Sequence, residues 1–249
     1  MRQEMLEAFP ITFDPGRTAR AVVVHAVGDL PAALVALGLP AGRPAVVVVG
    51  GAAGLAAADR APIHRLCAEA ILPAAAAAGA ALVDGGTNAG VMQLVGQAYA
   101  AEARGLPLVG VAALGAIGAP DGAAGSVAAV RARLEPHHTH FVLVPGAAWG
   151  AESPWLAAVA GTLAGAAPSL TILMNGGAIA RTDVRHSVEA GRPVAILQGS
   201  GRMADELAGE IRADGAAGPP ASRLLTVFDM AGDPADLRRI ILSALTGRT

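Results

Sequence analysis

Residues 84–98 read DGGTNAGVMQLVGQA, and this stretch decides the fold that we expect. A short apolar run, Ala81–Asp84, leads into it, and the segment 88–104 that follows repeats its apolar side chains at helical spacing, at Val91, Leu94, Val95 and Ala98. Glycine in such a turn permits a positive φ and lets another group come close to the backbone. The stretch therefore predicts a buried strand, a tight turn that meets a ligand, and an amphipathic helix.

The same alternation of short apolar runs and helical patterns continues along the whole chain. We expect strands at Ala21–His25, Ala45–Gly50, Ala81–Asp84, Leu106–Ala112, Phe141–Val144, Leu170–Asn175, Val194–Gln198 and Leu224–Phe228. Several of these runs are apolar at every position, as in strands that are covered on both faces. The pattern predicts an α/β protein: one Rossmann-like domain over residues 1–249, doubly wound, with a mainly parallel sheet, helices on both faces and a short N-terminal extension at 1–19.

Composition narrows the classes of partner. The chain has 249 residues and a formal net charge of −2, so it lacks the basic surplus that binds nucleic acid, and we expect no nucleic-acid partner. All 18 basic residues are arginines. A phosphate-loop or Schiff-base lysine is thereby excluded, and an anion must meet backbone N–H groups, helix N-termini or arginine.

Other features predict a soluble, cytoplasmic protein without a membrane partner. Cys67 is the only cysteine, so no intramolecular disulfide forms, and its position within HRLCAEAI predicts a buried helical residue. Charges and proline in the first 16 residues argue against a signal peptide. The most apolar long window, 66–83, is interrupted by Glu69, Pro73 and Gly79 and is too rich in alanine to span a membrane.

Four of the expected strands end in glycine-rich turns, and these turns are the candidate ligand site. Their residues are Gly50, Gly51 and Gly54; Gly85, Gly86, Thr87, Asn88 and Gly90; Asn175, Gly176 and Gly177; and Gly199, Ser200, Gly201 and Arg202. Helices that begin after such turns offer free N–H groups to a phosphate, and an arginine can bind a diphosphate with two hydrogen bonds. The alternative is purely structural, because the chain holds 32 glycines and tight turns tolerate them.

The motifs resemble a known family. DGGTNAGVM at 84–92, LEPHHTHFVLV at 134–144, WGAE at 149–152, ILMNGG at 172–177 and PVAILQGSGRMAD at 193–205 occur in the order found in the amino-terminal cytosolic domain of TRPM channels. The chain is similar to the stand-alone prokaryotic TRPM-like (LSDAT) branch of the SLOG superfamily and, more distantly, to LOG (lysine-decarboxylase-like) and DprA/Smf proteins. The resemblance implies a Rossmann-like domain that binds a nucleotide-derived ligand, with ADP-ribose as the precedent.

Two functions follow from the resemblance, and the sequence leaves open whether the protein is an enzyme. The first is a ligand-binding protein or sensor that needs no cofactor, in which Asp205 orients a turn or a hydroxyl group. The second is a LOG-type nucleoside 5′-monophosphate phosphoribohydrolase, with Glu152 or Glu206 as the acid. The LOG motif is only partly present at 145–152, and no second carboxylate pairs with these residues by spacing. A third class is a partner-binding module or homo-oligomer that uses the alanine-rich helices.

The remaining candidates are aromatic and histidine residues. Trp149, beside Gly150, is expected to be exposed and to stack on a base, whereas Trp155 is expected in the core. His138 and His140 would share one face of a strand and could chelate a metal, but His137 departs from the family pattern. We therefore expect these histidines to form hydrogen bonds at the strand entry, predict no metal site, and expect Glu135 to be a solvated loop acid.

Overall fold

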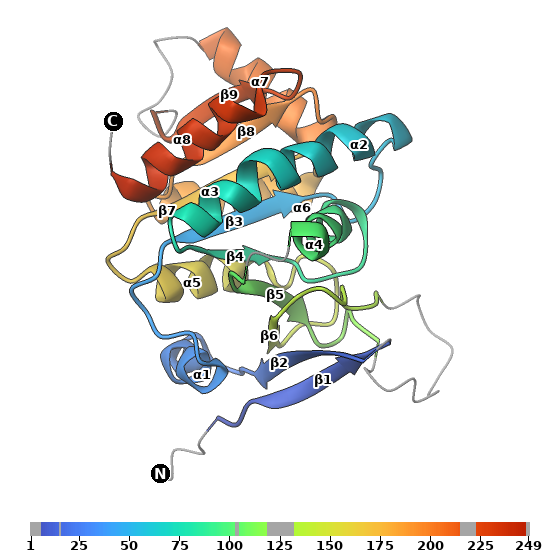
Figure 1. Ribbon diagram of the computed structural model, residues 1–249, viewed down its shortest axis with the longest axis vertical. Coiled ribbons are helices and arrows are strands. Elements are labelled where there is room, and N and C mark those ends of the chain that lie inside the picture. Colours follow the sequence, from blue (N-terminus) through green and yellow to red (C-terminus); the bar gives the residue numbers. More distant parts are fainter. Residues whose placement is uncertain (1–5, 15, 103–104, 119–131, 215–222, 248–249) are drawn as a thin grey trace.

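The computed structural model describes residues 6–14, 16–102, 105–118, 132–214 and 223–247. Its centre is one sheet in which nine described strands take the order β1-β2-β6-β5-β4-β3-β7-β8-β9 (Figure 1). The strands are β1 (Phe9–Phe13), β2 (Arg17–Val23), β3 (Ala45–Gly50), β4 (Ala81–Asp84), β5 (Leu108–Ala113), β6 (His140–Val144), β7 (Ser169–Met174), β8 (Val194–Gln198) and β9 (Leu225–Asp229). The mainly parallel, doubly wound α/β fold expected from the sequence is confirmed.

The edge of the sheet at β1 was not anticipated. All strand pairs are parallel except β1 with β2, which run antiparallel and pair Phe9 with Ala21. Part of the segment 1–19, expected as an extension, therefore belongs to the sheet, and β2 begins at Arg17 rather than at Ala21. The sequence signal was weak because Pro10 is tolerated only at a sheet edge and because Ile11 is the only buried residue of β1.

Helices cover both faces of the sheet, as expected. One face carries α1 (Leu30–Leu37), α5 (Ser153–Ala164), α6 (Ala178–Glu189) and α7 (Arg202–Asp214). The other carries α2 (Ala57–Leu66), the π-helical turn η2 (Cys67–Ile71), α3 (Leu72–Ala77), α4 (Gly90–Glu102) and α8 (Pro234–Thr246). Within β3, Val47 and Val49 pack towards the first face, and Val46 and Val48 pack towards the second. Continuous valine in this strand is thus explained by burial on both sides.

The N-terminal caps of α8 and α5 differ in how well the local sequence predicts them. Asp233 caps α8 as its Asp-Pro sequence suggests, because its Oδ1 accepts a hydrogen bond of 2.8 Å from the Ala235 N–H. The pair Ser153-Pro154 likewise suggests a serine cap for α5, with proline at the first helical position, but this prediction is wrong. Glu152 occupies the cap position without a capping side-chain hydrogen bond, and Ser153 is the first helical residue, 3% exposed. The turn 149–152 sets the start of α5 one residue earlier than the Ser-Pro pair indicates.

The order of the strands creates a switch point that positions the site. From β3 the chain continues through β4, β5 and β6 on one side of the sheet and through β7, β8 and β9 on the other. Strands β4, β3, β7 and β8 are neighbours and parallel, so their carboxyl ends meet at one edge. In such sheets, the crevice at the switch point is where ligands bind. All four glycine-rich turns follow these four strands.

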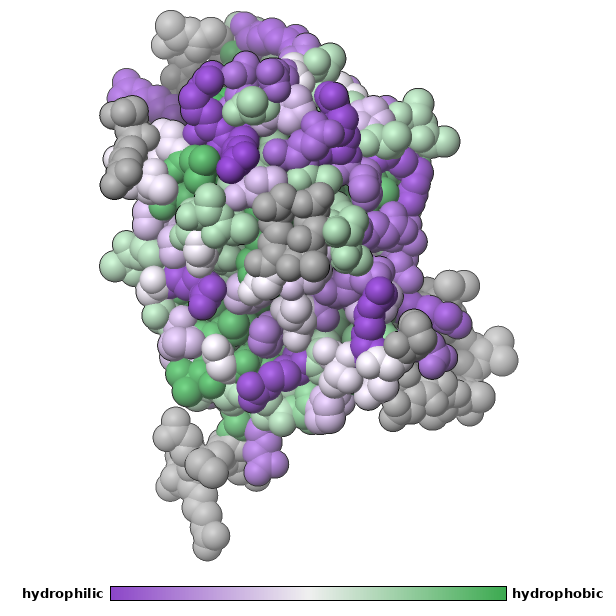
Figure 2. All heavy atoms as spheres, in the orientation of Figure 1, coloured by the Kyte–Doolittle hydropathy of each residue, from purple (hydrophilic) through white to green (hydrophobic). Residues whose placement is uncertain are grey.

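On the face in Figure 2, polar and apolar residues are interspersed. Among the described helices, none has both the length and the apolar character that spanning a bilayer requires.

Candidate functional site

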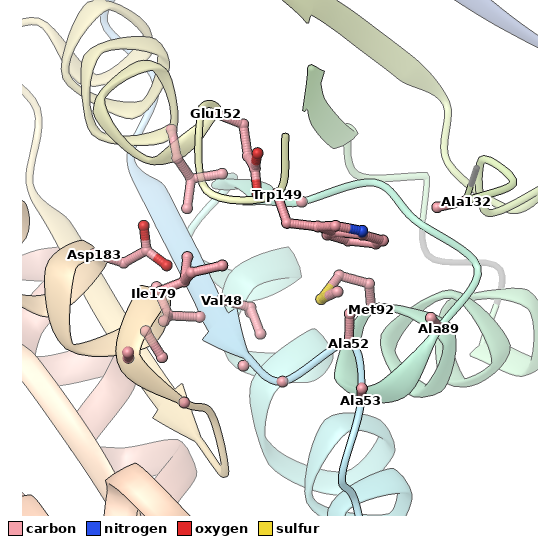
Figure 3. A pocket seen from close by; sticks show the side chains of 18 of the residues that line it. Val48, Ala52, Ala53, Ala89, Met92, Ala132, Trp149, Glu152, Ile179 and Asp183 are labelled. Carbon is pink, nitrogen blue, oxygen red and sulfur yellow. The ribbon is translucent and has the colours of Figure 1, made fainter. Parts of the chain in front are cut away.

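A cavity of about 610 Å³ lies at the switch point, outside the carboxyl end of β3 (Figure 3). The turn after β3, the start of α4, the start of α6 and the loop before α5 enclose it. Its lining residues are Val48, Val49, Gly50, Gly51, Ala52, Ala53, Gly85, Asn88, Ala89, Met92, Ala132, Arg133, Trp149, Glu152, Leu156, Gly177, Ala178, Ile179, Ala180, Asp183 and Arg202. The lining is mostly apolar, with a few charged groups, as in small-molecule sites.

The structure brings eight of the residues expected from the sequence into this lining. They are Gly50, Gly51, Gly85, Asn88, Trp149, Glu152, Gly177 and Arg202. The other expected residues do not line the cavity: Gly54, Gly86, Thr87, Gly90, Gly150, Asn175, Gly176, Gly199, Ser200, Gly201, Asp205 and Glu206. Each glycine-rich turn therefore contributes to the cavity, and the remaining residues of each turn support it from behind.

Most of these glycines are needed because another part of the chain packs directly against their backbone, where a Cβ would not fit. A Cβ on Gly90, whose φ is +52°, would lie 1.8 Å from the Gly51 carbonyl oxygen. A Cβ on Gly86 would lie 2.8 Å from the Cα of Gly110, and one on Gly176 would lie 2.5 Å from the Cβ of Ala180. Glycine at these positions lets neighbouring turns, strands and helices pack tightly, which sets the shape of the cavity without facing it.

Arg202 uses the space that two further glycines leave open. A Cβ on Gly54 would lie 2.9 Å from Nη1 of Arg202, and one on Gly177 would lie 2.8 Å from Nη2. Nη1 also donates a 2.7 Å hydrogen bond to the Ala53 carbonyl oxygen. The backbone of Arg202 is left-handed, with φ of 53°, which a non-glycine residue adopts at a cost. Across the described residues, no carboxylate lies within ion-pair distance of this guanidinium.

The polar residues behind the turns bond to one another. The Ser200 hydroxyl accepts from the Asn175 N–H at 2.8 Å and donates to the Leu197 carbonyl oxygen at 2.5 Å. Asn175, also left-handed with φ of 56°, donates from Nδ2 to the Ser200 carbonyl oxygen at 2.8 Å. Asp205 accepts from the Gly199 N–H at 2.6 Å. These side chains hold the turns after β7 and β8 together, so a phosphate cannot take the same hydrogen bonds.

At the α4 side of the cavity, Thr87 and Asn88 have different environments. Thr87 is 4% exposed and does not line the cavity, and its buried hydroxyl has no hydrogen-bond partner among the described residues. Asn88 is exposed, donates its N–H to the Arg133 carbonyl oxygen at 2.7 Å, and accepts from Gln93 at 3.1 Å. Gln93 in turn accepts from Arg60 at 2.7 Å. Asn88 therefore presents an ordered amide at the cavity wall.

Two carboxyl groups, those of Glu152 and Asp183, lie at the other side of the cavity, and only Glu152 is predicted from the sequence (Figure 3). Glu152 accepts from the Gly150 N–H at 3.0 Å, and burial raises its pKa. Asp183, on α6, has its pKa raised to about 6 by burial and by the negative charge of Glu152, against the opposing effect of Ser153. The available signal was the position of Asp183 six residues after Gly177, in the middle of the helix that follows the turn.

Glu206, the other expected acid, lies elsewhere. Its side chain is 61% exposed, and its Oε2 is 3.8 Å from Nη2 of Arg181, which also pairs with Glu210 at 2.7 Å. The helical face of α7 that carries Glu206 points to solvent and not to the cavity.

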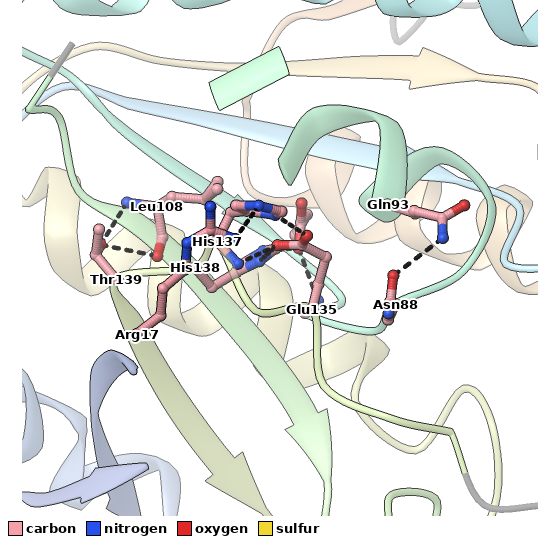
Figure 4. A network of polar contacts seen from close by, with 10 residues as sticks. Arg17, Asn88, Gln93, Leu108, Glu135, His137, His138 and Thr139 are labelled. Atoms are coloured by element: carbon pink, nitrogen blue, oxygen red, sulfur yellow. Dashed lines mark hydrogen bonds and ion pairs between the residues drawn. The ribbon is translucent and has the colours of Figure 1, made fainter. Parts of the chain in front are cut away.

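A buried network underlies the turn after β4 (Figure 4). His138, 2% exposed, bonds through Nε2 to Asp84 at 2.8 Å and through Nδ1 to Glu135 at 2.9 Å. Glu135 also bonds the ring of His137, whose other nitrogen contacts Arg17. The expectation that Glu135 is solvated is wrong, because it is 1% exposed. His140 starts β6, and burial together with the charge of Arg20 lowers its pKa to about 4.

This network ties the segment before β6 to the turn that lines the cavity. Asp84 accepts from the Gly86 N–H at 2.7 Å, and the Glu135 N–H donates to the Gly86 carbonyl oxygen at 2.9 Å. The histidines therefore form hydrogen bonds at the strand entry. In the described part of the chain, no three His, Cys, Asp or Glu side chains are grouped so that they could hold a metal ion.

Trp149 lies across the cavity from Val48 and Met92 and is 45% exposed (Figure 3). Its neighbour Trp155 is half-buried and packs against the core. One indole is thus available to a ligand, and the other stabilises α5.

Comparison with known proteins identifies the family and the fold. The family model described as "SLOG in TRPM, prokaryote" matches residues 43–238. No curated protein matches the chain. Among solved structures, the molybdenum cofactor binding protein from the phototrophic bacterium Rippkaea orientalis is similar, with a TM-score of 0.53 and 16% identity over 81% of this chain and 96% of that one.

Proposed function

The chain belongs to the prokaryotic SLOG-in-TRPM family, and from that membership we propose that its cavity binds a nucleotide-derived ligand that carries at least one phosphate group. The observation that carries the proposal is the guanidinium of Arg202. It lies at the cavity, it is held in a strained left-handed backbone, and it lacks an acidic partner among the described residues. Strain of this kind is retained where it serves a function, and a phosphate is the natural partner of an unpaired arginine.

The surroundings of Arg202 support an anion at the same place. Helix α6 begins at Ala178 without a capping side-chain hydrogen bond, and Gly177, Ala178 and Ile179 line the cavity. Its first N–H groups and the positive end of its dipole therefore face the space beside the guanidinium. A phosphate bound there would complete the helix cap and pair with arginine.

The rest of the cavity suits a nucleoside. A volume of about 610 Å³ lies within the range that accommodates a small organic ligand. Trp149 offers an exposed aromatic face on which a base can stack, with Met92 on the other side. A solved structure of similar fold is named for binding the molybdenum cofactor, so the fold is compatible with ligand binding.

The test replaces Arg202 with glycine, which removes the guanidinium and relieves the left-handed backbone. Calorimetry and thermal stability with AMP and with ADP-ribose measure binding to the wild type, to Arg202→Gly and to the control Arg212→Ala. Arg212 lies on the same helix, is exposed, and does not line the cavity. We expect Arg202→Gly to weaken binding about 10- to 100-fold, as for loss of a charged hydrogen bond, and Arg212→Ala to change nothing. Unchanged affinity in Arg202→Gly, or no binding by the wild type, would contradict the proposal.

One observation favours hydrolysis of the N-glycosidic bond as a second candidate. Glu152 lines the cavity with a raised pKa, as a general acid requires. The same incubations, assayed for free adenine, separate the two functions. A binding protein is stabilised by AMP without releasing adenine, whereas adenine release that is lost in Glu152→Gln would favour the hydrolase.

A further inference from the structure

We propose that Arg60 and Gln93 are positioning residues, which hold the side-chain amide of Asn88 so that its NH₂ group donates a hydrogen bond to an acceptor atom on the base of the ligand. This inference rests on the proposed function, because it assumes a nucleotide in the cavity with its phosphate beside Arg202. It goes beyond that function by assigning a specificity to the cavity wall at the start of α4, which selects a hydrogen-bond acceptor and rejects a donor.

Three side chains from different elements form a chain of hydrogen bonds that ends at the cavity. Arg60, on α2, donates from Nη2 to Oε1 of Gln93 at 2.7 Å. Gln93, on α4, donates from Nε2 to Oδ1 of Asn88 at 3.1 Å, as Figure 4 shows. Asn88 lines the cavity, whereas Arg60 and Gln93 do not. These two residues can therefore act on a ligand only through Asn88.

The arginine fixes the direction of both hydrogen bonds in this chain. A guanidinium has five N–H donors and no acceptor. Gln93 must therefore turn its oxygen to Arg60, which leaves its NH₂ group for Asn88. Asn88 in turn must accept with its oxygen, because an amide NH₂ group cannot accept. Both amide orientations thus follow from the guanidinium, and the NH₂ group of Asn88 is the part that is left for a ligand.

The NH₂ group of Asn88 is available and held in place. Nδ2 forms no hydrogen bond to any residue that the structure describes, and the side chain is exposed at the cavity wall. The backbone is also held, since the Asn88 N–H donates to the Arg133 carbonyl oxygen at 2.7 Å. Arg133 itself lines the same cavity and adds a second side chain that can only donate. A group that is ordered before the ligand arrives lowers the entropic cost of binding.

The position of Asn88 matches a base better than a phosphate. Asn88 is followed by Ala89 and Met92, and all three line the cavity together with Trp149. In Figure 3 the indole of Trp149 points towards Met92 and Ala89. A base stacked on this indole would lie beside the start of α4, with its edge towards Asn88. Adenine carries acceptor nitrogens in its ring plane, at N1, N3 and N7, and each can accept from an amide.

The experiment reverses the amide without a change in the cavity lining. Gln93→Glu keeps the size of the side chain and pairs with Arg60, but it can no longer donate. Asn88 should then turn its NH₂ group to the new carboxylate and its oxygen to the ligand. We expect calorimetry at pH 7 to show AMP and ADP-ribose bound about 10-fold more weakly, without a lower unfolding temperature. Gln97→Glu, exposed one turn further along α4 and outside the lining, is the matched control and should bind as the wild type does.

A double-mutant cycle separates positioning from charge. Asn88→Ala removes the amide and should weaken binding of AMP about 3- to 10-fold. In that background Gln93→Glu should cause no further loss, because no amide is left to reverse. A further loss as large as in the wild-type background would overturn the inference, since the new charge would then act on the ligand directly.

Three analogues of AMP test the assignment to the base. The 1-deaza, 3-deaza and 7-deaza forms each lack one acceptor nitrogen, and the wild type should bind one of them about 3- to 10-fold more weakly than AMP. Gln93→Glu should bind that analogue at least as tightly as it binds AMP. Equal affinity of the wild type for all four nucleotides would contradict a hydrogen bond from Asn88 to the base.

The outcomes separate this inference from the proposed function. If the wild type binds neither AMP nor ADP-ribose, or if Arg202→Gly binds them unchanged, the proposed function fails and the inference fails with it. If Arg202→Gly weakens binding but Gln93→Glu does not, the inference alone is wrong.

Discussion

The imidazole of His138 lies 2.8 Å from the carboxylate of Asp84 and joins the segment before β6 to the turn after β4. Its other nitrogen lies 2.9 Å from Glu135, so both ring nitrogens donate to carboxylates and the ring is a buried imidazolium. The turn that it supports carries Gly85 and Asn88 into the cavity. The network is therefore part of the scaffold of the site.

Removal of His138 should destabilise the protein strongly. His138→Leu would leave the carboxylates of Asp84 and Glu135 buried without their cation, which costs about 3–5 kcal/mol of unfolding free energy. Denaturant unfolding at pH 7 measures the loss. His25→Gln, at an exposed position, is the control and should stay within about 0.5 kcal/mol of the wild type. A loss below about 1 kcal/mol in His138→Leu would contradict the buried ion pairs.

The stability of the protein should fall on the alkaline side. Burial disfavours the charged form of His138, but Asp84 and Glu135 outweigh it and raise the pKa from 6.5 to about 9. A raised folded-state pKa gives stability that is complete below pH 6.5 and is lost as the pH rises through 9. The shift corresponds to about 3 kcal/mol. Unfolding curves between pH 6 and pH 10 measure it, and the decline should be absent from His138→Leu.

The free energy of unfolding should fall as Asp183 ionises, whereas the ionisation of an ordinary paired carboxylate stabilises a folded protein. Its pKa is raised from 3.8 to about 6 by burial, with Ser153 opposing and Glu152 adding to the effect. Ionisation is therefore costlier in the folded state, and this contribution to stability declines as the pH rises from about 4 to 6. Asp183→Asn should remove the decline and raise unfolding free energy at pH 7 by about 1–3 kcal/mol. Lower stability of the variant at pH 7 would show that the charge is favourably paired.

Two glycines in helix interiors should respond oppositely to alanine. A Cβ on Gly96, in α4, would lie 2.1 Å from the Glu135 carboxyl group, whereas a Cβ on Gly209, in α7, meets nothing within 4 Å. Gly209→Ala should stabilise the protein by up to about 1 kcal/mol through helix propensity. Gly96→Ala should destabilise it by about 1–3 kcal/mol, because overpacking displaces a buried network. Thermal unfolding of both variants measures the contrast, and equal effects would contradict the contact.

Periodic signals accounted for most of the fold. The uninterrupted valines of β3 indicate a strand that is buried on both faces, and the helical spacing of apolar residues in α4 indicates a helix that is buried on one face. The strand β1 was missed because an edge strand with a single buried residue carries little periodicity. Likewise, Glu135 was misjudged because a loop position next to proline does not reveal that two imidazoles surround its carboxyl group.

The sequence by itself determined the family, the α/β architecture and the edge of the sheet at which the turns meet, because motif order and strand direction are properties of the chain. Only the tertiary structure decided the use of each turn residue. In the folded protein the Arg202 side chain occupies the space above Gly54 and Gly177. Ser200 and Asn175 form hydrogen bonds with each other. Asp183 lies near enough to Glu152 for the charge of Glu152 to raise its pKa. These pairs lie on different elements of the chain, and their contacts depend on how α5, α6 and α7 pack against one sheet, which no local spacing encodes.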